Sequence, residues 1–127
     1  MKVTFIRPNI GDRPSTDAMT PLVFSILSAL TPSHIDRVLY DDRLEKIPFD
    51  EPTDLVAMTV ETYTARRSYQ LAHEFRKRGV PVVMGGYHPT FMPDEVLQHA
   101  DAIANGDAEG IWAQILADAA AMAELKA

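Results

Sequence analysis

Cysteine is absent from this chain of 127 residues. The absence excludes disulfides, thiolate metal sites, iron–sulfur ligation and cysteine nucleophiles within the chain. Long apolar runs are absent too, since none approaches the ~18 residues of a membrane-spanning helix. The first residues become charged too soon for a signal peptide. We therefore expect no membrane insertion and a cytoplasmic location.

An excess of basic charge is also missing. The chain has 12 basic and 18 acidic residues, and its net charge is −6. A surface that binds nucleic acid broadly is basic, so we expect no nucleic-acid partner. The histidines show no H-x-x-x-H spacing. We accordingly assign no metal ligand and no catalytic residue.

What the sequence does contain is a regular alternation of strand and helix patterns, with 46% apolar residues. Strands are predicted at 3–6, 35–40, 55–60, 80–84 and 102–104, and helices at 21–30, 65–78, 93–100 and 111–126. Strands linked by crossovers predict an α/β domain with a parallel sheet. At this length we expect a single doubly wound, flavodoxin-like (Rossmann-type) sheet of five parallel strands in the order 2-1-3-4-5.

Ligands of such sheets bind at the carboxyl ends of the strands. The strand at 80–84 runs directly into Gly85-Gly86-Tyr87-His88-Pro89-Thr90, which is typical of a loop where a ligand can approach the backbone. Thr59 lies at the end of the third strand and Thr62 just beyond it, and Gly106 and Gly110 follow the fifth. Together they predict a shelf of backbone and hydroxyl groups for a large ring with a long tail.

Plainer roles for the same residues stay open. A glycine after a strand often serves only a turn. Thr62 or Thr64 can cap the next helix instead of binding a ligand. His88 is the side chain in this loop best placed to touch a ligand, but a histidine at such a position more often bonds to the loop backbone.

Several familiar sites of this fold lack their motifs here. No G-x-G-x-x-G follows the first strand, and no Walker loop or G-x-S-x-G elbow is present. A receiver domain is not indicated either, because the first strand ends in Arg7, Glu61 follows the third strand, and no lysine follows the fifth. A flavodoxin phosphate loop is excluded by the proline- and aspartate-rich segment after the first strand.

An ordered set of short motifs covers nearly the whole chain. They are Arg7-Pro8, Pro21-Leu22, Asp54-Leu55-Val56-Ala57-Met58-Thr59, Gly85-Gly86-Tyr87-His88-Pro89-Thr90, Pro93-Asp94-Glu95, Ala100-Asp101-Ala102 and Gly106-Asp107-Ala108-Glu109. With them the chain resembles the amino-terminal cobalamin-binding domain of cobalamin-dependent radical S-adenosylmethionine enzymes. That group includes the anaerobic magnesium-protoporphyrin monomethyl ester cyclase and methyltransferase-like relatives. Gly-Gly-x-His-Pro-Thr is the most specific of these motifs.

The resemblance implies that cobalamin lies on the carboxyl edge of the sheet. The cofactor-binding residues that it implies are Pro8, Thr59, Glu61, Thr62, Gly85, Gly86, Tyr87, His88, Gly106, Asp107 and Glu109. The nucleotide tail would insert near the threonines and the glycine pair. No Asp-x-His-x-x-Gly run follows the first strand, so the resemblance implies no protein ligand beneath the cobalt.

The resemblance also implies a longer parent protein. Residues 1–127 would be its cobalamin-binding domain, because the last helix carries no stop signal, as expected of a domain cut from a longer chain. A carboxyl-terminal radical-SAM domain would hold the 4Fe-4S cluster and S-adenosylmethionine. This chain is then not itself an enzyme but the accessory domain of a methyltransferase or cyclase. The alternative is a non-catalytic docking domain that has lost cofactor binding, which Glu61 favours because its charge would repel a tail phosphate.

Overall fold

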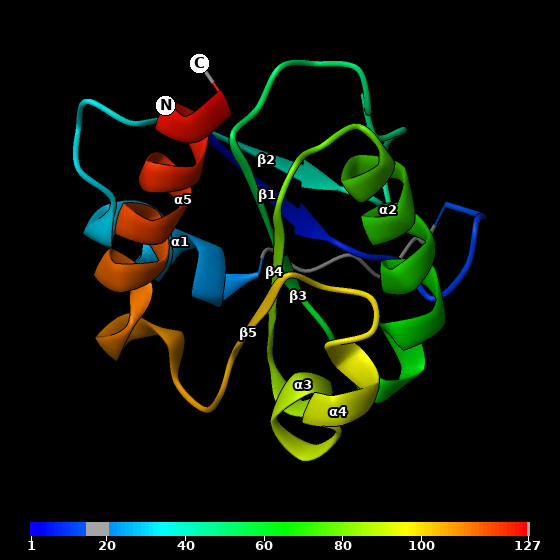
Figure 1. The fold of residues 1–127 in the computed structure, drawn as a ribbon. Helices are drawn as coiled ribbons and strands as arrows, with labels where there is room; N and C mark the ends of the chain where they lie inside the picture. Colours follow the sequence, from blue (N-terminus) through cyan, green and yellow to red (C-terminus); the bar gives the residue numbers. More distant parts are fainter. Residues whose placement is uncertain (15–20, 127) are drawn as a thin grey trace.

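One parallel sheet forms the centre of the molecule (Figure 1). The computed structural model describes residues 1–14 and 21–126. The strands are β1 (Lys2–Arg7), β2 (Asp36–Asp41), β3 (Leu55–Thr59), β4 (Val82–Gly85) and β5 (Ala102–Ala104). They lie in the order β2-β1-β3-β4-β5, with every pairing parallel. The predicted fold class and strand order are confirmed.

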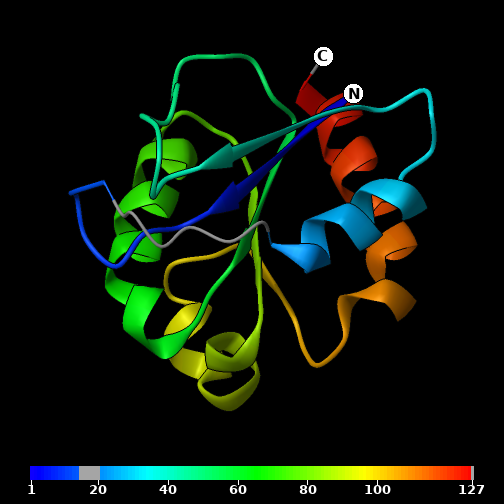
Figure 2. The same cartoon turned by 180° about the vertical axis from the view of Figure 1, so that it is seen from behind.

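Helices cover both faces of the sheet. They are α1 (Leu22–Leu30), α2 (Ala65–Lys77), α3 (Tyr87–Phe91), α4 (Pro93–Val96) and α5 (Trp112–Lys126), with short 3-10 turns at Thr62–Thr64 and Ala108–Gly110. Figures 1 and 2 show α1 and α5 together on one face and α2 on the other, where α3 and α4 lie near its first turns. Among the described residues, no helix is long and apolar enough to cross a membrane.

The strand β3 shows why the sheet needs helices on both sides. Val56 and Met58 belong to the core under α2, whereas Leu55 and Ala57 belong to the core under α1 and α5. Successive side chains of a strand point to opposite faces, so an uninterrupted apolar run supplies both cores at once. The sequence of a central strand therefore predicts the doubly wound arrangement.

The segment after β4 differs from the prediction of an open loop. Helix α3 begins at Tyr87, directly after the glycine pair, and its short run ends at Phe91. Pro89 stands in the first turn, where its missing N–H removes no intrahelical hydrogen bond. The helix predicted at 93–100 also ends early, at Val96. In the sequence, proline and glycine indicate a loop in this segment. The positions that they occupy are also compatible with the start of a helix.

The backbone path requires a glycine at position 86. Its φ is +109°, and a Cβ there would lie 2.8 Å from the carbonyl oxygen of Val60. The backbones also bond directly, because Val60 N–H donates to Gly85 O at 2.7 Å and His88 N–H donates to Val60 O at 3.2 Å. The space beside Gly86 is thus filled by the backbone that follows β3.

This close approach predicts the effect of adding one methyl group. Gly86→Ala should lower the free energy of unfolding by at least about 2 kcal/mol, through the positive φ and the contact with Val60. Gly110→Ala is the control, because no atom lies within 4 Å of its Cβ position, and should change stability by less than about 0.5 kcal/mol. Urea denaturation followed by circular dichroism measures both. Equal midpoints for the two variants would contradict the assignment.

Candidate functional site

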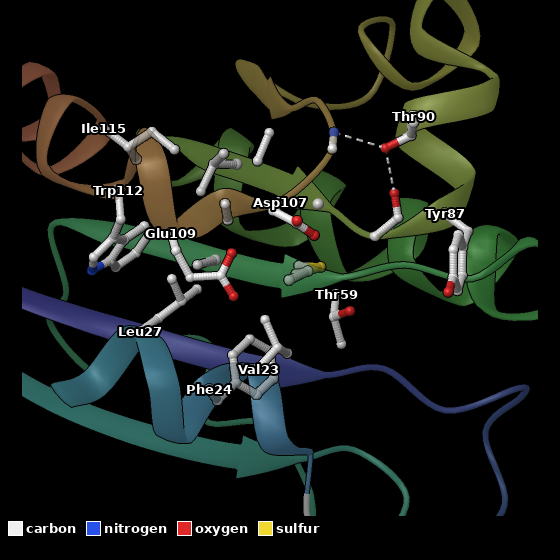
Figure 3. Close-up of a pocket in the computed structure, with 18 of the residues that line it drawn as sticks. Val23, Phe24, Leu27, Thr59, Tyr87, Thr90, Asp107, Glu109, Trp112 and Ile115 are labelled. Carbon is white, nitrogen blue, oxygen red and sulfur yellow. Dashed lines mark hydrogen bonds between the residues drawn. The ribbon is translucent and has the colours of Figure 1, made fainter. Parts of the chain in front are cut away.

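A cavity of about 340 Å³ opens at the carboxyl edge of the sheet, between the ends of β3, β4 and β5 and the helices α1 and α5 (Figure 3). Its size is that of a small-molecule site. The fold places it where ligands of open α/β sheets bind, outside the strand ends. Both the volume and the position make this cavity the candidate site.

The inner wall of the cavity is apolar. Phe24 and Leu27 line it from α1 and Trp112 from α5, and all three are buried. Phe5 packs behind them, with its ring centroid 5.2 Å from that of Phe24 and 5.6 Å from that of Trp112. The indole N–H of Trp112 donates to Thr31 Oγ1 at 2.9 Å. Its one polar atom is therefore already paired.

The mouth of the cavity is acidic. Glu61, Asp107 and Glu109 line it together with Thr59, and no basic side chain of the described residues does so. None of the three carboxylates takes part in an ion pair within the described part of the chain. Carboxylates accept hydrogen bonds and repel anions. The mouth thus suits a ligand that presents N–H or O–H groups.

Helix α3 forms the wall beside β4. The hydroxyl of Thr90 donates to Gly86 O at 2.9 Å and accepts from Gly106 N–H at 3.1 Å, which ties α3 to the segment after β5 (Figure 3). Tyr87 and Phe91, one turn apart, stack with centroids 6.3 Å apart. They are 68% and 73% exposed. Such exposure of two large rings beside a cavity favours contact with a ligand or another domain.

The structure brings most of the predicted site residues together. Those that line the cavity are Thr59, Glu61, Gly85, Gly86, Tyr87, Gly106, Asp107 and Glu109. Pro8, Thr62 and His88 do not line it. The helices contribute further lining residues that were not predicted as site residues from the sequence, namely Val23, Phe24, Leu27, Thr90, Phe91, Trp112 and Ile115. A helix face that lines a cavity has the same apolar periodicity as one that packs in a core.

His88 is the buried member of a partly buried polar network instead. It is 6% exposed. Its Nε2 lies 2.7 Å from Glu95 Oε2 and 3.1 Å from the Tyr69 hydroxyl, and its Nδ1 lies 3.2 Å from Thr62 Oγ1. Tyr69 donates to Glu95 at 2.6 Å, and its ring stacks on His99. The network fastens α3 to α2 and α4, on the side of α3 away from the cavity.

The electrostatics of the network follow from these contacts. Burial, and then the hydrogen bond to Glu95, raise the pKa of Tyr69 well above its usual value. The hydrogen bonds from Tyr69 and then His88 lower the pKa of Glu95. Glu95 is therefore a carboxylate at neutral pH, and Tyr69 stays a neutral donor. The hydrogen-bonding groups of His88, Tyr69 and Glu95 thus find partners within the network.

The segment directly after Pro8 makes a second structural contact. The next residue, Asn9, donates its N–H to Asp42 Oδ2 at 3.0 Å. Asp42 is buried and also receives two hydrogen bonds from the Arg67 guanidinium, at 2.9 and 3.0 Å. This bidentate pair fixes the segment after β1 against α2.

Comparison with known proteins identifies the family of the chain. The B12 binding domain family model matches residues 28–116. The chain belongs to this family. It is 41% identical over 100 residues to the bacteriochlorophyllide d C-8(2)-methyltransferase of Chlorobaculum tepidum, and 30% identical over 100 residues to the C-12(1)-methyltransferase of the same organism.

These matches cover only part of the relatives. The aligned region is 78% and 77% of this chain but 22% of each methyltransferase. No solved structure matches the chain significantly. The assignment of this chain to the B12-binding family therefore rests on the family model and on two much longer methyltransferases.

The hydrogen bonds of buried His88 predict the cost of removing its side chain. His88→Ala should lower the free energy of unfolding by about 2 kcal/mol or more, since Tyr69, Glu95 and Thr62 each lose a partner. His73→Ala on the exposed face of α2 is the control and should change stability by less than about 0.5 kcal/mol. Urea midpoints compare the two variants. A His88 variant as stable as the control would show that the network does not stabilise the fold.

The raised pKa of Tyr69 predicts an alkaline dependence of stability. Above pH ~10 the unfolded chain loses the phenolic proton while the folded chain keeps it, so stability falls as pH rises. Tyr69→Phe should be less stable at pH 8 but should lose less stability between pH 9 and 11. Urea midpoints across this range measure the slope, and equal slopes in both proteins would contradict the role of Tyr69.

Proposed function

We propose that this domain binds cobalamin, with the nucleotide tail in the cavity and the corrin ring over its mouth. The observation that carries the proposal is a cavity of about 340 Å³ at the carboxyl edge of the sheet, in a chain of the B12-binding family. The cavity has an apolar interior and a polar mouth. That division matches a ligand whose tail ends in an aromatic base and whose ring is rimmed by amides.

The residues of the cavity fit such a ligand group by group. Leu27 and Trp112 would pack against the base. The carboxylates of Asp107 and Glu109 would accept hydrogen bonds from amide N–H groups of the corrin rim. The exposed rings of Tyr87 and Phe91 would cover apolar surface of the ring. Bound cobalamin supplies a cobalt centre that can carry a methyl group, while these residues hold and orient it.

The remaining predicted residues keep a proposed role at the rim. Thr59 lines the cavity beside Gly85 and Gly86, so we place the ribose and phosphate of the tail near them. The phosphate must lie away from Glu61, because like charges in a poorly solvated site repel. We keep Pro8, Thr62 and His88 as supports of the walls, since they lie outside the cavity.

The longer relatives support a proposal for the whole protein. Both are methyltransferases by name, and the chain matches 22% of each. We propose that the parent is a cytoplasmic, cobalamin-dependent radical-SAM methyltransferase. A separate domain would supply the 4Fe-4S cluster and S-adenosylmethionine, and this domain would present cobalamin to it. A bacteriochlorophyllide-like tetrapyrrole is the substrate that the relatives suggest.

A docking domain without cofactor is the second candidate. The acidic mouth favours it, because Glu61, Asp107 and Glu109 oppose the charge of a tail phosphate. On this alternative the cavity would be closed by a neighbouring domain and not by a ligand. The two candidates differ in whether the isolated chain takes up cobalamin.

Titration with hydroxocobalamin tests the proposal directly. Trp112 is the single tryptophan of the chain and lines the cavity, so a bound corrin should quench its fluorescence. We expect saturable quenching below ~100 μM, an affinity of at least about 5 kcal/mol, and a base-off absorbance spectrum. No quenching in this range would contradict cobalamin binding by this domain and favour the docking alternative.

A pair of matched variants assigns the binding to the cavity. Ala108→Leu places a larger side chain into the lining and should weaken binding about tenfold or more. Ala113→Leu makes the same change at an exposed position of α5 outside the lining, and should bind like the parent chain. Equal affinities for both variants would show that cobalamin binds elsewhere.

A further inference from the structure

The cavity is graded from an apolar end to a polar end. Every lining side chain that is buried is apolar, from Phe24 and Leu27 on α1 to Ala57 and Val83 in the strands. The polar lining residues Thr59, Thr90, Glu61, Asp107 and Glu109 are all partly or fully exposed. A ligand that enters therefore leaves its hydrogen-bonding partners at the mouth.

The buried end offers no side-chain hydrogen bond to a ligand. The indole N–H of Trp112 is already donated to Thr31, whose hydroxyl in turn donates to Leu27 O at 2.7 Å. The backbone of β3 and β4 is paired within the sheet. Any polar atom of a ligand that reaches this end would lose its bonds to water and gain none.

Corrinoids differ in the aromatic base at the end of the tail. The outer edge of a benzimidazole carries only carbon and hydrogen, whereas a purine such as adenine presents ring nitrogens and an amino group there. An unpaired polar group in a buried site costs enough to weaken binding about tenfold or more. The buried end of this cavity therefore distinguishes the two classes of base.

We propose that this domain selects its corrinoid by the base, taking benzimidazole-type tails and discriminating against purine-type tails. The inference rests on the proposed function, because it places the tail in the cavity. The selecting residues are the buried apolar side chains of α1 and α5, with Leu27 and Trp112 at the centre. The acidic mouth does not distinguish these ligands, since both carry the same corrin, ribose and phosphate.

Three corrinoids separate this inference from the proposed function. Cobalamin carries dimethylbenzimidazole, pseudocobalamin carries adenine, and cobinamide lacks the nucleotide tail. Dissociation constants come from the quenching of Trp112 in the 127-residue chain. We expect cobalamin to bind most tightly and pseudocobalamin about tenfold or more weakly.

The outcomes are distinct. Equal affinity for cobalamin and pseudocobalamin, both above that of cobinamide, would overturn base selection while leaving the tail in the cavity. Cobalamin binding no tighter than cobinamide would overturn the inference and leave only corrin binding. Absence of binding by all three corrinoids would overturn the proposed function together with the inference.

A near-isosteric variant tests the physical cause. Val83 lines the cavity from β4 and is 4% exposed, so it belongs to the buried end. Val83→Thr should narrow the preference for cobalamin over pseudocobalamin by about threefold or more, because it supplies a partner for the purine. Val82→Thr is the control: Val82 is the buried neighbour on the same strand but lies outside the lining, and its variant should leave the ratio unchanged. An unchanged ratio in the Val83 variant would overturn the assigned cause.

Discussion

The close passage of two backbones, at Gly86 and Val60, is the constraint on which the site depends. Val60 N–H donates to Gly85 O, and His88 N–H donates to Val60 O. Only a residue without Cβ can stand at Gly86, because the φ is positive and the Val60 oxygen would be 2.8 Å from a side chain. This crossing ends β4 and starts α3 at once, so it fixes the direction of the helix that walls the cavity.

The two faces of α3 have different roles. Tyr87, Thr90 and Phe91 line the cavity, whereas His88 points into the network with Tyr69 and Glu95. A helix this short has no stability of its own. The hydrogen-bond network on one side therefore holds in place the residues that line the cavity on the other side. The most specific motif of the sequence thus combines a backbone crossing, an anchor and a wall of the cavity.

The fold could be predicted from the sequence because its signals are local. The apolar run of β3, buried on both faces, indicates a central parallel strand, and the helical periodicities between strands indicate the crossovers. Strand order followed from size and connection rules. The helix α3 could not be predicted in this way. Gly86 and Pro89 are loop signals on average, and only the contact with Val60 shows that they start a helix.

The sequence by itself determined the class of the sheet, the edge at which the cavity opens and most of the strand-end residues that line it, since these depend on residue order and period. Only the tertiary structure decided that His88 is an anchor away from the cavity and that Leu27 and Trp112 line it. The physical reason is that a helix face carries the same apolar pattern whether it meets a core or a cavity. Which of the two it meets depends on contacts between segments far apart in the chain.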